Sequence, residues 1–193
     1  MEAIGELIWV GSYGSTSVDD ICEKAGVKKG SFYYFFESKA DLAIAAIDAA
    51  WQVRRGELDT IFSSSVPPLE RFKKLADYLY ESQKEVFSQF NCVLGCPLYA
   101  LGAEVSTHEE RLQQKIQEVL DCKRKYIESA IRDADAEGVI NAPDPAGKAR
   151  IVFTYYHGLL TEARIRNDLQ VLKDAELGIF EVLGVKSKAA QAA

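Results

Sequence analysis

Apolar residues recur at intervals of three and four positions along nearly the whole chain, which is the spacing of one face of an α-helix. In the segment 108–137, for example, Leu112, Ile116, Val119 and Ile127 fall on one face and charged residues on the other. The sequence lacks the alternation of apolar and polar residues that marks a half-buried strand. The pattern therefore predicts an all-α protein.

Proline and glycine interrupt this pattern and set the limits of the predicted helices. Pro68 and Pro145 suit the first turn of a helix, and Gly95 separates two helices in the middle of the chain. The helix at 39–62 is long enough to leave a first domain and enter a second, so we expect it to connect them. The predicted helices cover residues 2–13, 17–24, 28–35, 39–62, 68–89, 97–105, 108–137, 145–166 and 168–183.

Two short predicted helices, joined by a tight turn, lie near the N-terminus. Thr16 and Ser17 can cap the first helix, and Gly26 suits a left-handed stop at its end. A helix, a turn containing glycine and a second helix are typical of the helix-turn-helix unit that binds DNA. Side chains of the second helix and its flanks can donate to phosphates or base edges. They are Lys28, Lys29, Ser31, Tyr33, Tyr34 and Lys39.

The order of residues in this segment resembles the recognition region of the TetR family of bacterial transcription regulators. The resemblance is carried by Thr16-Ser17-Val18 with Ile21, Ala25-Gly26-Val27, Lys29-Gly30-Ser31, Tyr33, Phe36, Ser38-Lys39 and Leu42. It implies a DNA-binding site made of Thr16, Ser17, Lys28, Lys29, Gly30, Ser31, Tyr33, Tyr34 and Lys39.

By the same resemblance these residues divide into two roles. Tyr33 and Lys39 are expected to contact phosphates, and Lys28, Ser31 and Tyr34 are expected to read bases. Lys29 suits either role. The three phenylalanines of the region, Phe32, Phe35 and Phe36, are expected in the core.

The resemblance also implies a two-domain organisation. We expect an N-terminal helix-turn-helix domain at 1–45, a larger helical domain for effector binding and dimerisation at 46–186, and a frayed tail at 187–193. The family usually senses a small molecule in the larger domain, although for each candidate an ordinary core position explains the residue equally well. The candidate pocket residues are Phe87, Phe90, Leu94, Leu98, Tyr99, Tyr126, Phe153, Tyr156, His157 and Arg164.

The predicted helices at 145–166 and 168–183 carry more apolar surface than one subunit should need. Large exposed apolar patches are rare in monomers, so we expect these helices to form a homodimer interface. Its candidate residues are Tyr155, Leu159, Leu160, Leu172, Ile179 and Phe180.

The charge of the chain argues against a general nucleic-acid coat. The net charge is −6, and the first 39 residues have more acidic than basic side chains. DNA binding would therefore depend on a few placed contacts. The charged residues of this segment are Lys24, Lys28, Lys29 and Lys39 against Glu2, Glu6, Asp19, Asp20, Glu23 and Glu37.

The sequence offers no support for catalysis, a cofactor or a metal. It has no nucleophile elbow, phosphate loop or HExxH motif, its only histidines are His108 and His157, and its four cysteines lack zinc-ligand spacing. The cysteines fit a reducing cytoplasm, and no apolar run is long enough to span a membrane. Cys92 and Cys96 suit either a thiol sensor or, as we prefer, small core positions.

The first predicted helix is short for the family and contains no Lys or Arg before Ser12. Either the native chain starts upstream of Met1, or this protein binds DNA with fewer electrostatic contacts than its relatives. The sequence thus predicts a ligand-responsive DNA-binding regulator whose partners are a DNA operator, a second copy and a small apolar or amphipathic effector. The resemblance implies that it is a repressor and that the effector releases it from the operator. The alternative is a helical dimer that binds a ligand or partner but not DNA.

Overall fold

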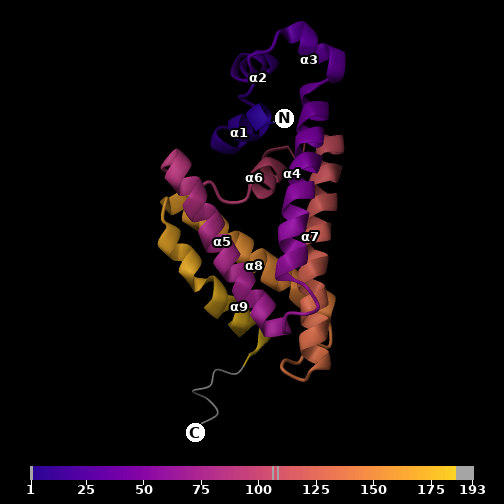
Figure 1. Cartoon of the computed structure of the whole chain (residues 1–193), viewed down its shortest axis with the longest axis vertical. Helices are drawn as coiled ribbons and strands as arrows, with labels where there is room; N and C mark the ends of the chain where they lie inside the picture. The colour runs from indigo at the N-terminus through magenta and orange to yellow at the C-terminus, as the bar shows by residue number, and fades with distance from the viewer. Residues whose placement is uncertain (1, 106, 108, 186–193) are drawn as a thin grey trace. The chain divides into compact units, whose positions relative to one another are not determined.

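The structure is a computed structural model that describes residues 2–105, 107 and 109–185 (Figure 1). Within these residues the chain forms helices and no strands, as the sequence pattern predicts. The helices are α1 (Glu2–Val10), α2 (Val18–Ala25), α3 (Lys29–Phe35), α4 (Lys39–Ile61), α5 (Pro68–Phe90), α6 (Pro97–Val105), α7 (Glu110–Ala136), α8 (Pro145–Arg166), the 3₁₀ helix η1 (Leu169–Asp174) and α9 (Ala175–Leu183).

Two predicted helices differ from the observed ones by more than one or two residues at an end. α1 ends at Val10 rather than at residue 13, because Ser12 and the residues after it form a tight turn. The predicted helix at 168–183 is instead a 3₁₀ segment followed by α9. The Asp168 carboxylate caps η1 by accepting a hydrogen bond from the Gln170 N–H at 2.8 Å. The hydroxyl of Tyr155 donates to the Asp174 carbonyl, where the two segments meet, at 3.1 Å.

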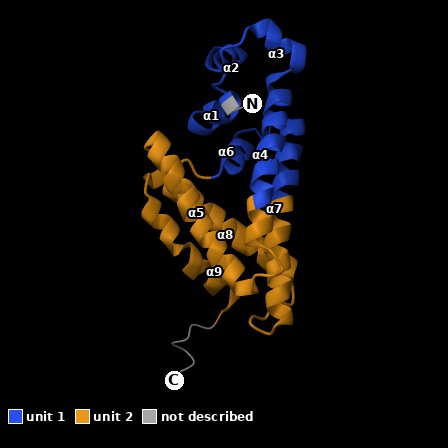
Figure 2. Ribbon diagram, in the orientation of Figure 1, with its two compact units in different colours: residues 1–56, 96–121 blue, residues 57–95, 122–193 orange. Residues whose placement is uncertain are grey.

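The chain divides into two compact units that each combine distant segments (Figure 2). Unit 1 consists of residues 1–56 and 96–121, and unit 2 consists of residues 57–95 and 122–193. The expected division near residue 45 thus falls inside the α4 portion of unit 1. α4 and α7 each contribute to both units.

The core of unit 1 joins the helix-turn-helix to helices from the middle of the chain. α2 contributes Ile21 and Cys22, and α3 contributes Phe32. α6 contributes Leu101, and the first half of α7 contributes Ile116. The N-terminal unit is therefore not made of one continuous segment, because α6 and α7 supply part of its apolar core.

The core of unit 2 is formed by α5, α8, η1, α9 and the second half of α7. Phe72, Ile131 and Ile179 are completely buried. Arg71 is also buried, and its guanidinium donates to Val66 O at 2.8 Å and to the Asp133 carboxylate at 2.5 Å. This pairing satisfies a charge that would otherwise be costly to bury.

The loop between α5 and α6 is fixed to unit 2 by side chains. The buried amide of Gln83 accepts a hydrogen bond from the Gly95 N–H at 2.8 Å and donates to the Gly95 carbonyl at 3.3 Å. Arg164 donates to Leu94 O at 3.1 Å, and Asn167 accepts from the Val93 N–H at 2.8 Å. The loop that leads into α6 is therefore attached to both α5 and the C-terminal end of α8.

Candidate functional site

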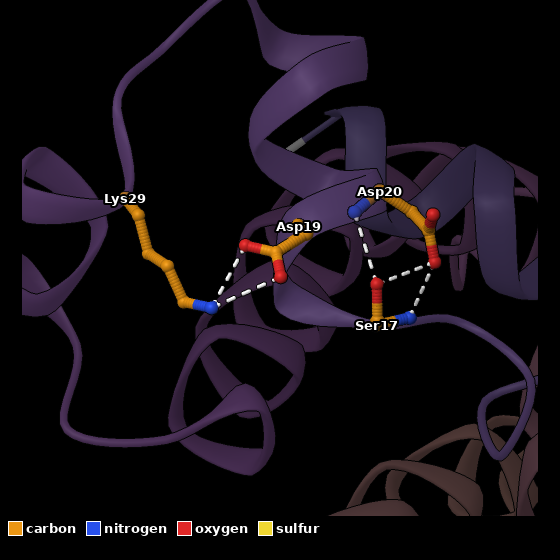
Figure 3. Close-up of polar contacts among 4 residues, drawn as sticks. All are labelled: Ser17, Asp19, Asp20 and Lys29. Atoms are coloured by element: carbon orange, nitrogen blue, oxygen red, sulfur yellow. Dashed lines mark hydrogen bonds and ion pairs between the residues drawn. The ribbon is translucent and has the colours of Figure 1, made fainter.

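The helix-turn-helix expected from the sequence is formed by α2, a tight turn and α3, all in unit 1. Ser17 caps α2, because its Oγ accepts a hydrogen bond from the Asp20 N–H at 3.1 Å. The Asp20 carboxylate accepts in return from the Ser17 N–H at 2.7 Å and from its hydroxyl at 2.6 Å (Figure 3). These bonds hold the pKa of Asp20 below its ordinary value. Gly26 ends the helix at a φ of 65°, where glycine is unstrained.

α3 packs on unit 1 through Phe32 and exposes most of its other side chains. Tyr33, Tyr34 and Phe35 are 54%, 81% and 72% exposed. The expectation that Phe35 is a core residue is therefore wrong, because it lies at the exposed end of α3 while Phe36 is half-buried. The expected DNA-contacting residues that are exposed are Ser17, Lys28, Lys29, Gly30, Ser31, Tyr33 and Tyr34.

Lys29, at the first position of α3, forms an ion pair with Asp19 of α2. Its Nζ lies 2.8 Å from Asp19 Oδ1 and 3.0 Å from Asp19 Oδ2 (Figure 3). The hydrogen bond and the charge of Asp19 raise the pKa of Lys29 above its ordinary value. The pair joins the two helices of the unit at their exposed surface.

Thr16 and Lys39 have structural partners in the turn between α1 and α2. The Thr16 side chain is buried, and its hydroxyl donates to Ser12 O at 2.7 Å. The Lys39 ammonium donates to Tyr13 O at 2.7 Å and to Thr16 O at 2.8 Å, and it lies 4.0 Å from the centre of the Tyr13 ring. Burial lowers the pKa of Lys39. Both side chains thus fix the turn that leads into α2.

Glu104 of α6 contacts the same turn, a role that no sequence motif predicts. Its carboxylate accepts from the Tyr13 N–H at 3.0 Å and from the Gly14 N–H at 2.5 Å. Tyr13 is buried, and burial, followed by the Glu109 carboxylate, raises its pKa to about 12. The turn is therefore held by α4 through Lys39 and by α6 through Glu104.

The ten residues expected to line an effector pocket fall in both units. Phe153, Tyr156 and His157 form an aromatic cluster in unit 2, with ring centroids 4.2 to 5.3 Å apart. Tyr126 packs on Phe62 with a centroid distance of 5.8 Å. The members in unit 1 are Leu98 and Tyr99, and those in unit 2 are Phe87, Phe90, Leu94, Tyr126, Phe153, Tyr156, His157 and Arg164.

His157 is a packed core residue. Its Nδ1 donates to the Phe153 carbonyl at 2.9 Å, and its side chain is buried. Burial and, to a lesser extent, the charge of Lys123 outweigh the Phe153 hydrogen bond and lower the pKa of His157 to about 3, so the ring is neutral at physiological pH. The other histidine, His108, lies outside the described residues.

A shallow surface pocket of about 280 Å³ lies on another part of unit 2, and the expected pocket residues do not line it. Its lining is amphipathic, because apolar side chains of α5 and η1 meet charged side chains of α5, η1 and α9. The lining residues are Ala76, Asp77, Tyr80, Glu81, Leu172, Lys173 and Glu176.

The residues expected at a dimer interface fall into two groups. Leu160, Leu172 and Ile179 are buried in the core of the subunit itself, so they offer no surface to a second copy. Tyr155, Leu159 and Phe180 are half-buried. The apolar residues that are most exposed in this region are not among these six candidates. These are Ile151, Ile165 and Leu177, which are 59%, 74% and 64% exposed.

The cysteines and the acidic residues form no metal-binding group within the described residues. Cys92 and Cys96, on either side of the 93–95 loop, are half-buried and free, as is Cys122. Cys22 is buried in the core of unit 1.

None of the helices in the described part of the chain has the length and hydropathy needed to cross a bilayer.

The chain is similar in sequence to curated transcriptional regulators and in fold to solved structures. An uncharacterised HTH-type transcriptional regulator from the lacX 3′ region of Lactococcus lactis is 29% identical over 195 residues, which cover 96% of this chain and 93% of the relative. The HTH-type transcriptional repressor NemR of Escherichia coli is 23% identical, with 82% and 78% covered. A TetR regulatory protein from Rhodobacter sphaeroides has a TM-score of 0.80 at 24% identity, covering 94% of this chain and 97% of the other.

Two family models match consecutive parts of the chain. The model described as "Bacterial regulatory proteins, tetR family" matches residues 1–46, which contain α1 to α3 and the start of α4. The model described as "Tetracyclin repressor-like, C-terminal domain" matches residues 68–178, which is more than half of the chain. With the helix-turn-helix geometry and the helical second unit, these matches establish that the chain belongs to the TetR family of bacterial transcription regulators.

Proposed function

We propose that this TetR-family regulator is a repressor that leaves its DNA operator when a small molecule binds. The observation that carries the proposal is the exposed surface of α3. Phe32 anchors the helix, while Tyr33, Tyr34 and Ser31 face solvent beside Lys28. Hydroxyl and ammonium groups on one short helix match the donors that contact phosphates and base edges in a major groove. The similarity to the repressor NemR supports repression over activation.

The proposed signal starts in the second unit. We place the effector among the packed rings of Phe153, Tyr156 and His157, which would have to move apart to admit it, because aromatic side chains commonly bind apolar or amphipathic molecules. The loop fixed by Gln83 and Arg164 continues directly into α6. An effector that shifts α6 would move Glu104, which holds the turn before α2, and the population of DNA-competent molecules would fall.

The proposed regulator is a homodimer. Ile151 and Ile165 on α8 and Leu177 on α9 leave large apolar side chains exposed on neighbouring helices of unit 2. A second copy would cover these residues around a two-fold axis, together with the half-buried Tyr155, Leu159 and Phe180. A dimer presents two copies of α3 to successive major grooves, as helix-turn-helix proteins require.

A mobility-shift assay with the upstream region of the protein's own gene tests the proposed function. We expect a sequence-specific complex that Tyr34→Ala weakens and that an organic extract of the producing cells dissociates. Mass spectrometry of the purified protein would then identify the effector. Specific binding that no extract component affects would contradict the ligand-responsive part of the proposal.

One observation favours the alternative of a dimer that does not bind DNA. Lys24, Lys29 and Lys39 all contact groups of the protein itself, so much of the positive charge in the first 39 residues is engaged. Under this alternative, neither the upstream region nor unrelated duplex DNA would bind at low salt. The same assay therefore separates the two functions.

A further inference from the structure

We propose that Asp19 competes with DNA phosphates for Lys29 and thereby limits the affinity of this regulator for duplex DNA of any sequence. The inference rests on the proposed DNA binding by α2 and α3. The acidic side chains of the N-terminal segment would then have a function, because Asp19 would keep binding to DNA of any sequence weak.

The geometry of the pair makes Asp19 a substitute for phosphate. Both carboxylate oxygens lie within 3.0 Å of the Lys29 ammonium, so the lysine already has an anionic oxygen partner of the kind that a phosphate would supply (Figure 3). The pair connects two helices rather than neighbouring turns of one helix, and both side chains are exposed. Lys29 therefore meets DNA with its charge already offset by Asp19.

The N-terminus of α2, next to this pair, could also attract an anion, but a carboxylate of the chain itself already lies there. The N-terminus of α2 offers backbone N–H groups that commonly bind phosphate. Here the Asp20 carboxylate accepts from the Ser17 N–H and hydroxyl, and Ser17 Oγ accepts from the Asp20 N–H. Asp19 and Asp20 thus place two carboxylates at groups that would otherwise attract the DNA backbone (Figure 3).

The expected effect follows from how DNA binding depends on salt. Each phosphate that a lysine neutralises releases condensed counterions, which steepens the fall of affinity with salt by about one unit of logarithmic slope. A lysine already paired with a carboxylate contributes less to this term, and the displaced carboxylate repels the phosphate. Removing the charge of Asp19 should therefore strengthen binding and steepen the salt dependence together.

The test is a set of fluorescence-anisotropy titrations with a scrambled 30-base-pair duplex and with the upstream region at several NaCl concentrations. We expect Asp19→Asn to bind the scrambled duplex about two- to fivefold more tightly at low salt, with a slope steeper by about one. Glu23→Gln removes the same charge from the same helix at a carboxylate that is not the ion-pair partner of Lys29, and it should change affinity much less. In the Lys29→Ala background, Asp19→Asn should have only the small effect of one lost negative charge, no larger than that of Glu23→Gln.

Equal gains from Asp19→Asn and Glu23→Gln, or an equal gain with and without Lys29, would overturn the inference, because the effect would then be bulk charge. The ion pair has its own test without DNA. Because Asp19 raises the pKa of Lys29, Asp19→Asn should lower that pKa in a ¹⁵N-detected titration, and an unchanged pKa would also overturn the inference. If none of these proteins binds DNA, the proposed function fails as well.

Discussion

Lys39 combines a structural contact with an expected DNA contact in one side chain. Its ammonium donates to Tyr13 O and Thr16 O and lies over the Tyr13 ring. We therefore predict that Lys39→Ala lowers the free energy of unfolding by about 1–2 kcal/mol, because two charge-assisted bonds are lost. It should also weaken DNA binding, and if Lys39 contacts a phosphate the salt slope should fall by about one.

Urea unfolding and DNA titrations of the same variant separate these two effects. Lys28→Ala is the matched control, because Lys28 is exposed at the start of α3 and forms no capping bond with its side chain. It should weaken DNA binding without changing the free energy of unfolding. A Lys39→Ala protein as stable as the wild type would show that the turn does not depend on this lysine.

His157 makes the stability of the protein depend on pH in a defined window. Its pKa is lowered to about 3 by burial, whereas an unfolded histidine titrates near 6.5. The unfolded chain therefore binds the proton more readily. The stability that comes from a neutral His157 is complete above about pH 6.5 and is lost as the pH falls toward 3, by roughly 1.4 kcal/mol per pH unit.

We predict that His157→Gln flattens the dependence of stability on pH between about 6.5 and 4.5. Glutamine does not titrate, and its amide can donate to the Phe153 carbonyl in place of Nδ1. Urea midpoints of the wild type and the variant at three pH values measure the difference, and carboxylates common to both proteins cancel. Parallel curves would mean that His157 is protonated without loss of stability.

At the level of single elements, the two tyrosines of α3 should have different roles in DNA binding. Tyr34 is 81% exposed, whereas the ring of Tyr33 packs edge-on against Phe32 at 5.0 Å. We predict that Tyr34→Ala changes which sequences are bound, while Tyr33→Phe weakens binding to all sequences by a similar factor. Selection of bound duplexes from a random pool measures the first effect, and titration against the scrambled duplex measures the second. An unchanged sequence preference of Tyr34→Ala would contradict its base-reading role.

Local signals predicted most helices because their causes lie within a few residues. The Ser17 cap, the Gly26 stop and Pro68 at the start of α5 all act inside one turn. The break between η1 and α9 escaped prediction because one of its contacts comes from Tyr155, nineteen residues before Asp174. Glu104 escaped for the same reason, since its partner Tyr13 is 91 residues away. Sequence pattern predicts an element, but it does not predict contacts between distant ones.

At the scale of the whole molecule, apolar periodicity indicated which helix faces are buried. It did not indicate whether the subunit's own core or a second subunit would bury them. Leu160 and Ile179 fit a helical stripe that we assigned to a subunit interface, and both are buried within the subunit. α6 and the first half of α7 belong to unit 1, although their sequence lies within the range expected for the second domain. Such assignments depend on how segments pack together, and a single sequence carries little information about that.

The exposed apolar residues of unit 2 give the last prediction, which concerns assembly. Ile151 on α8 and Leu177 on α9 are 59% and 64% exposed, so a charge at either position leaves the fold of the subunit intact. We predict that Ile151→Glu and Leu177→Glu convert a dimer into folded monomers that fail to shift operator DNA. Leu160→Glu is the contrasting control, because it buries a charge in the core and should unfold the subunit instead. Sedimentation velocity with circular dichroism distinguishes dissociation from unfolding, and a wild type that sediments as a monomer at micromolar concentration would refute the interface.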